Sequence, residues 1–181
     1  LIADRPILRQ LLAEPGNEGL LPFTNELLRQ SALSLDVSDI YVLDITGRTV
    51  ATSNYRAPHS FLGRQFAFRP YFTDAMNAGL GRFHALGTTS GQRGYFFASP
   101  VIDNTEIVGV VVVKLRLGRF EDAWAATESS LIVTDTNNVI FLSDRADWHF
   151  RSTAPLEAAV LQRISETRQY PTERISPLTI T

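Results

Sequence analysis

Three strand-like segments follow one another closely between residues 81 and 117, and they limit the fold more than any other feature of the sequence. The segments are GRFHALG, GYFFASPVI and EIVGVVVVKLRL, with the polar turns TTSGQR and DNTE between them. Turns this short join neighbouring antiparallel strands, because a parallel crossover needs about a dozen residues or more. Two earlier strand-like runs, Ile40–Ile45 and Thr49–Ser53, are joined by a Thr-Gly turn. The sequence therefore predicts an antiparallel meander of five strands, with a helical insert after the second strand.

Helical segments accompany this sheet. Residues 1–36 have apolar positions at helical spacing, interrupted by EPGNEG, and we expect them to lie alongside the sheet. FRPYFTDAMNAG predicts a short helix, with Pro70 in its first turn and Gly79 as its end. GRFEDAWAAT predicts another short helix that closes the unit.

The pattern then starts again. SLIVTDTNNVIFLSD, residues 130–144, repeats the order and spacing of DIYVLDITGRTVATS, and Asp135 corresponds to Asp44. An amphipathic helix, PLEAAVLQRISETRQ, follows the second copy, but no further strand-like segments come after it. We therefore expect a second unit of the same kind that is incomplete.

Composition excludes several classes of function. The net charge of −2 and the pI near 5.9 do not favour nucleic acid as a partner. The chain has no cysteine, and no apolar run has the roughly 18 residues of a membrane span. His59, His84 and His149 lack the spacing of metal ligands, so neither a metal nor another cofactor is expected. A hydrolase that uses Ser90 with His84 stays a weak alternative, because GTTSG lacks the GxSxG spacing.

The loop GTTSGQR has features of an anion-binding loop. Thr88, Thr89 and Ser90 supply three hydroxyls, and the flanking glycines allow backbone N–H groups to approach a ligand. A plain hairpin turn with solvated hydroxyls is the alternative.

Two arginines, one before and one after this loop in the sequence, have aromatic neighbours. Arg69 lies in FAFRPYF, a composition typical of a pocket wall or core edge, although a surface arginine is the usual outcome. Arg93 and Tyr95 follow the loop, and strand alternation puts Tyr95, Phe97 and Ser99 on one face.

Lys114, the only lysine of the chain, ends a run of four valines. Alternation puts it on the same face as Val110 and Val112. If that strand is central and covered, the ammonium must either reach the strand end or meet an anion, because an unpaired buried charge costs several kcal/mol. The pattern alone leaves both alternatives open.

The segments GRQFAFRPYFTDAMNAG, GRFHALGTTSGQRGYFFASPV and GVVVVKL together resemble a known family. They are similar to the extracytoplasmic sensors of C4-dicarboxylate-sensing histidine kinases, the Dct-type sensors of the double Cache (tandem PAS-like, PDC) class. The resemblance covers residues 38–170, with SLIVTDTNNVIFLSDRADW and RISETRQYP in the second unit. It implies an α+β fold of two PAS-like units, with antiparallel sheets, helices and a long N-terminal helix alongside. The implied domains are an N-terminal helical segment (1–36), a membrane-distal ligand-binding unit (37–127) and a partial membrane-proximal unit (128–181).

The resemblance also implies residue roles. RPYFTDA matches the Cache pattern whose arginine binds a ligand carboxylate, which corresponds to Arg69, with Tyr71 as part of its aromatic pair. The amino-acid-binding branch has an aspartate at the position of Lys114, and that aspartate holds the ligand ammonium. Two cations would repel an ammonium and accept two carboxylates, so a C4-dicarboxylate such as succinate, fumarate or malate is expected. The implied ligand-binding residues are Arg69, Tyr71, Thr88, Thr89, Ser90, Arg93, Tyr95, Phe97 and Lys114.

The resemblance places this segment in the bacterial periplasm, as the non-enzymatic sensor of an inner-membrane histidine kinase that regulates dicarboxylate transport. The implied parent chain is membrane-anchored and homodimeric. Two alternatives stay open: a Cache sensor of another small carboxylate in a chemoreceptor or cyclase, and a structural interaction domain without a ligand.

Overall fold

The computed structural model describes residues 2–14, 16–17, 19–124 and 131–179, and the contacts within the chain divide it into two units. The first unit comprises Leu1–Phe83 and Tyr95–Leu115, and the second comprises His84–Gly94 and Arg116–Thr181. The expected boundary between residues 127 and 128 lies outside the described residues. This division differs from the predicted one because residues 1–36 group with the sheet, whereas His84–Gly94 and the described residues from Arg116 onward, including the helix expected to close the first unit, group with the second unit.

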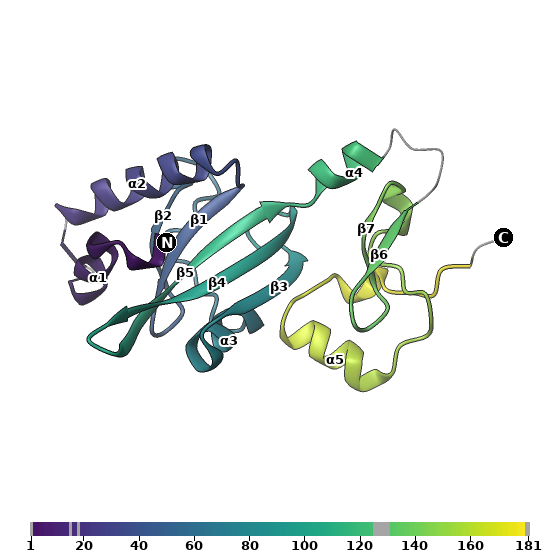
Figure 1. Cartoon of the computed structure of the whole chain (residues 1–181). Coiled ribbons are helices and arrows are strands. Elements are labelled where there is room, and N and C mark those ends of the chain that lie inside the picture. Colours follow the sequence, from purple (N-terminus) through teal and green to yellow (C-terminus); the bar gives the residue numbers. More distant parts are fainter. Residues whose placement is uncertain (1, 15, 18, 125–130, 180–181) are drawn as a thin grey trace. The chain divides into compact units, whose positions relative to one another are not determined.

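A five-stranded sheet with the order β2-β1-β5-β4-β3 forms the centre of the first unit (Figure 1). β1 (Asp39–Asp44) pairs antiparallel with β2 (Thr49–Thr52) on one side and with β5 (Glu106–Arg116) on the other. β4 (Arg93–Asp103) and β3 (Gly81–Leu86) complete the sheet. The prediction of five strands is confirmed, but the predicted meander is wrong, because β1 pairs with β5 and β2 does not pair with β3. The order inserts the first hairpin beside the last strand, which makes β1 and β5 central.

Helices α1 (Pro6–Ala13) and α2 (Leu20–Ser34) cover one face of this sheet (Figure 1). The interruption at EPGNEG separates them, as the sequence predicts. Leu8 and Leu28 are fully buried in a cluster that includes Val42 of β1. Because side chains alternate along a strand, this cluster takes one set of β1 and β5 side chains and leaves the other set for the opposite face. A 3-10 turn precedes α1 at Ile2–Asp4.

Helix α3 (Pro70–Ala78) begins and ends as its sequence predicts. Pro70 occupies the first turn, and Gly79 ends the helix in the left-handed conformation with φ 82°. The start of β3 lies directly against the first turn of α3, because a Cβ added to Gly81 would be 1.9 Å from the carbonyl oxygen of Tyr71. Only a glycine allows this approach, which fixes the first turn of α3 relative to the sheet.

The second unit contains a two-stranded antiparallel sheet, β6-β7, with short helices. Val139, Phe150, Ile164 and Tyr170 form its buried apolar cluster. The predicted hairpin and the helix after it are therefore present. Its elements are α4 (Gly118–Trp124), β6 (Ile132–Thr134), β7 (Ile140–Ser143), a 3-10 turn at Ala146–Trp148, α5 (Ala158–Glu166) and a 3-10 turn at Thr172–Arg174.

The two hairpins share the same turn chemistry. The Oδ1 atom of Asp44 accepts hydrogen bonds from the amides of Thr46 and Arg48, at 2.8 and 3.1 Å. The Oδ1 atom of Asp135 accepts the equivalent bonds from Asn137 and Val139, at 2.8 and 2.9 Å. Each aspartate thus organises the tight turn that follows its strand. The correspondence of Asp44 and Asp135 predicted from the sequence is confirmed.

Across the described part of the chain, no helix combines the length and the apolar character needed to cross a membrane.

Candidate functional site

Arg69 and Lys114 are the two largest cations in the interior of the first unit. Their exposed fractions are 1% and 0%, and each belongs to a different element. Arg69 is the residue before Pro70 and has the extended conformation that a following proline favours. Its carbonyl oxygen accepts the amide of Phe72, so helix α3 starts directly after it. The Pro-induced bend therefore puts a guanidinium at the N-terminal end of α3, in the interior.

Lys114 lies near the end of β5, directly opposite Asp39 in the register of β1. Its Nζ atom is 3.8 Å from Oδ2 of Asp39. It also lies 5.8 Å from the ring centroid of Phe61 and 5.9 Å from that of Phe96. Lys114 thus shares the face of the sheet that α1 and α2 do not cover. The strand-end alternative is wrong, because the side chain is buried rather than extended into solvent.

The guanidinium of Arg69 also lies among aromatic rings. Its Cζ atom is 5.2 Å from the ring centroid of Phe68 and 5.8 Å from that of Phe83. Cations at such distances from ring faces are attracted by the ring quadrupole. This aromatic wall partly replaces water around the charge.

Tyr41 and Tyr71 connect the surroundings of the two cations. Their hydroxyls are 2.8 Å apart, and both side chains are buried. Tyr71 stacks on Phe96, the ring next to Lys114, with centroids 5.3 Å apart. Tyr41 contacts Phe61, the other ring next to Lys114. Both cations therefore border one group of aromatic side chains. We call this group the aromatic cluster, and its members are Tyr41, Phe61, Phe66, Phe68, Tyr71, Phe83 and Phe96.

Burial raises the pKa of both tyrosines in this cluster. Burial is the main cause of the raised pKa of Tyr41, and Tyr71 adds to it. Burial likewise raises the pKa of Tyr71, although its bond to Tyr41 and the charge of Arg69 oppose the shift. Both hydroxyls thus keep their protons at neutral pH. One hydroxyl donates to the other within the pair, so the pair can offer one O–H donor beside two cations, which is the chemistry that binds carboxylates.

The structure brings three of the sequence-predicted residues together: Arg69, Tyr71 and Lys114 all border the aromatic cluster. It does not bring Tyr95 and Phe97 there. Phe96 and Ala98 of β4 are buried on the side of Lys114, so the alternating neighbours Tyr95 and Phe97 project from the opposite face, where their rings pack against each other at 4.6 Å.

The remaining predicted residues belong to the second unit. Thr88 is exposed, and Thr89 and Ser90 are half-buried, with the Ser90 hydroxyl accepting the amide of Gln92 at 3.3 Å. Arg93 forms a bidentate ion pair with Glu121. Their role in ligand binding stays a prediction.

Sequence reasoning missed Asp39, Tyr41, Phe61 and Phe96. A signal for Tyr41 existed in the alternation of its strand, which separates it from Ile40 and Val42. Asp39 becomes a neighbour of Lys114 only through the pairing of β1 with β5, which no local pattern predicts. The described residues contain no cluster of three or more His, Cys, Asp or Glu side chains that could hold a metal ion.

Comparisons with known proteins place the chain in a family, although no family model matches it. The C4-dicarboxylate transport sensor protein DctB of Pseudomonas aeruginosa is 40% identical over 178 residues, which are 98% of this chain. The chain spans only 29% of that relative's length. The crystal structure of the sensor domain of Vibrio cholerae DctB matches with a TM-score of 0.91 and 39% identity, over 98% of this chain and 69% of that one.

More distant structures share only the fold. The ligand-binding domain of the Campylobacter jejuni chemoreceptor Tlp3 is 15% identical and matches with a TM-score of 0.58, over 79% of this chain and 60% of that one. The identity and the coverage of the V. cholerae structure carry the assignment, and the distribution of strands and helices agrees with it. The chain belongs to the family of DctB-type sensor domains, whose fold is α+β and PAS-like.

Proposed function

We propose that this chain is the extracytoplasmic ligand-binding domain of a membrane-anchored histidine kinase, and that it binds C4-dicarboxylates such as succinate, fumarate or malate. The observation that carries the proposal is the burial of Arg69 and Lys114 against one aromatic cluster that also contains two hydroxyls. The names of the matched relatives, C4-dicarboxylate transport sensors, support the same ligand class.

The charge of the two buried residues supports the proposed ligand class. Each of the two buried cations attracts a ligand carboxylate, and Lys114 does so with Asp39 3.8 Å away. A ligand with two carboxylates can meet both, whereas the ammonium of an amino acid would be repelled by the second cation. The aromatic rings supply apolar contact for the short carbon chain between the carboxylates.

Typical strengths of hydrogen bonds to charged groups are sufficient for a micromolar affinity. A hydrogen bond to a charged group contributes about 1.5–3 kcal/mol. Several such bonds from Arg69, Lys114 and a tyrosine hydroxyl would together approach the roughly 8 kcal/mol of a micromolar site. Binding and positioning are enough for this function, and no catalytic group is required.

Signalling follows from a difference in affinity. A ligand shifts a receptor between two states only if it binds one of them more tightly. We propose that a dicarboxylate favours the state in which Arg69 and Lys114 both contact it, and that the parent kinase, a periplasm-facing homodimer, responds to this state and regulates dicarboxylate transport.

Isothermal titration calorimetry tests the proposal. Succinate is titrated into the wild type, Lys114→Met and Arg69→Met, and each variant is checked by far-UV circular dichroism and thermal unfolding. Arg56→Gln is the matched control, because it also removes one positive charge but from a side chain that is 72% exposed. The expected result is succinate binding by the wild type and the control, with a loss of about tenfold or more in each buried variant. Tight binding of leucine without a response to succinate, or unchanged affinity in folded Lys114→Met, would contradict it.

A further inference from the structure

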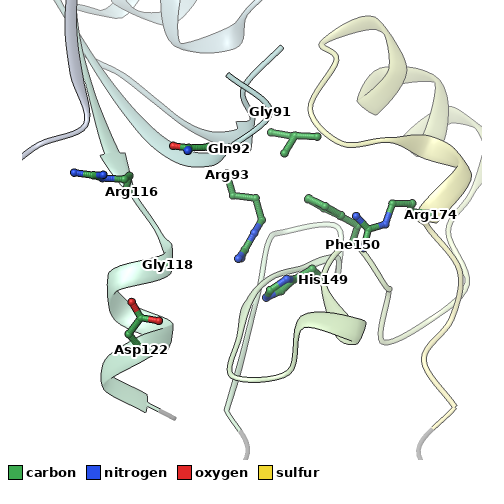
Figure 2. A pocket seen from close by; sticks show the side chains of 10 residues that line it. Gly91, Gln92, Arg93, Arg116, Gly118, Asp122, His149, Phe150 and Arg174 are labelled. Carbon is green, nitrogen blue, oxygen red and sulfur yellow. The ribbon is translucent and has the colours of Figure 1, made fainter. Parts of the chain in front are cut away.

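The second unit contains a cavity of its own, with a volume of about 500 Å³ (Figure 2). This volume is in the range of small-molecule sites, roughly 300–1,000 Å³. All the residues that line it belong to the second unit, so the cavity is separate from Arg69 and Lys114. The lining residues are Leu86, Gly91, Gln92, Arg93, Arg116, Gly118, Asp122, His149, Phe150 and Arg174.

Arg93 is held rigidly in the wall of this cavity. Its Nη1 and Nη2 atoms donate to the two carboxylate oxygens of Glu121, and Nη1 also donates to the carbonyl oxygen of Phe141 at 2.9 Å. Within the described part of the chain, these bonds use three of the five N–H donors of the guanidinium. The edge formed by Nε and the second Nη2 hydrogen is a side-on fork for a carboxylate or phosphate.

Glu121 is the residue that orders this wall. It also accepts the amide of Ser143 at 3.1 Å, and Nε2 of His149 lies 2.9 Å from its Oε1 atom. Burial alone would raise the pKa of Glu121, but the bonds from Arg93 and Ser143 lower it below its ordinary value. Glu121 is therefore a carboxylate at neutral pH and keeps both Arg93 and His149 in place. Figure 2 shows Arg93 and His149 pointing toward one another.

Arg174 supplies a second guanidinium from the opposite side of the cavity. Its Cζ atom is 4.8 Å from the ring centroid of Phe150, and Figure 2 shows the two side chains next to each other. Stacking on a ring orients a guanidinium and leaves its N–H edge directed sideways. Arg116 extends away from Arg93 and His149 in the same view, so we assign it no part in the site.

We propose that this cavity is a second ligand site, in which Arg93 and Arg174 bind a small organic anion that carries carboxylate or phosphate groups. Phe150 contributes the apolar wall, and His149 adds a polar group beside Arg93. This site is independent of the dicarboxylate site proposed for the first unit. A second site of this kind would let the sensor respond to a further metabolite without competition at Lys114.

Titration of the full chain with citrate and with inorganic phosphate, at constant ionic strength, tests this inference. The variant Lys114→Met serves as the background, because it removes a cation of the first unit only. Arg174→Gln removes one guanidinium of the cavity, and its exposed position makes loss of the fold unexpected. Arg145→Gln is the matched control, since Arg145 is half exposed, lies in the same unit and does not line the cavity.

The expected result is binding of citrate or phosphate by Lys114→Met, in which the proposed dicarboxylate site has lost one of its cations. Arg174→Gln should weaken that binding about tenfold, and Arg145→Gln should leave it unchanged. Binding of citrate alone identifies carboxylates as the ligand chemistry, and binding of phosphate alone identifies phosphate groups. Absence of binding of both anions, an equal loss in Arg174→Gln and Arg145→Gln, or a loss confined to Lys114→Met would overturn the inference.

Discussion

Asp39 and Lys114 lie directly opposite each other on β1 and β5, and Nζ of Lys114 is 3.8 Å from Oδ2 of Asp39. The same Oδ2 atom accepts a hydrogen bond of 2.6 Å from the hydroxyl of Ser38. Asp39 therefore faces both the lysine and any carboxylate that binds there. It stabilises the cation of the unliganded domain and repels the carboxylate of the proposed ligand.

The variant Asp39→Asn should therefore lower the stability of the unliganded domain without lowering its affinity for succinate. We expect a lower free energy of unfolding without ligand, because a buried lysine loses a counter-charge, and a succinate affinity that is equal or higher, because a repulsion is removed. Calorimetric titration and urea unfolding of the same preparation measure the two effects. A tenfold fall in affinity would instead mean that Asp39 is required to position Lys114.

The hydroxyl pair Tyr41–Tyr71 predicts a coupled effect on stability. Tyr41→Phe or Tyr71→Phe alone leaves one buried hydroxyl without its observed partner, which should cost about 1 kcal/mol. The double variant removes both hydroxyls and should cost little more than either single one. Urea unfolding of the four proteins gives the coupling energy. Strictly additive losses would show that the 2.8 Å pair contributes nothing to the folded state.

Local sequence patterns were sufficient for the strands, the turns and helix α3, because these depend on residues that are close in the chain. The same patterns also put Lys114 and Val112 on the same face of their strand, as the structure has them. They could not decide whether that face is covered, since the cover comes from Phe61 and from α3, which are remote in sequence.

Most features of the site that local sequence patterns could not predict depend on the pairing of β1 with β5. A simple chain of hairpins would put β2 next to β3, and Asp39 and Tyr41 would then be far from Lys114. The same limitation affected Tyr95 and Phe97. Their common face was predicted correctly, but which face meets Arg69 and Lys114 depends on where the helices pack.

Gly81→Ala should disturb the ligand site through the backbone. The new methyl group would lie 1.9 Å from the carbonyl oxygen of Tyr71, so β3 and the first turn of α3 must separate. Overpacking of this kind typically costs about 1–3 kcal/mol. We expect a lower melting temperature together with weaker succinate binding, because Arg69 and Tyr71 move with α3. Gly16→Ala is the control, since nothing lies within 4 Å of its added Cβ. An unchanged succinate affinity in folded Gly81→Ala would show that ligand binding does not depend on the position of α3.

Glu26 predicts a specific dependence of stability on pH. Its carboxylate accepts hydrogen bonds from Arg29, Gln30 and Tyr55, and these bonds, with Arg29 first, lower its pKa to about 2 from an ordinary value of 4.5. A carboxyl whose pKa is lower in the folded state stabilises that state above the unfolded pKa, and this contribution is lost as the pH falls toward the folded pKa.

The wild type should therefore be more stable than Glu26→Gln at neutral pH, and the difference should shrink between pH 4.5 and about 2. Urea unfolding followed by far-UV circular dichroism at several pH values measures it. Glu106→Gln, which removes a carboxylate from the exposed start of β5, is the control. A difference between the wild type and Glu26→Gln that stays constant down to pH 2 would mean that the four bonds contribute no net stability, because solvent and salt screen a partly exposed group. Because Tyr55 lies after β2 and Glu26 lies on α2, convergence would identify this carboxylate as a pH-dependent link between α2 and the sheet.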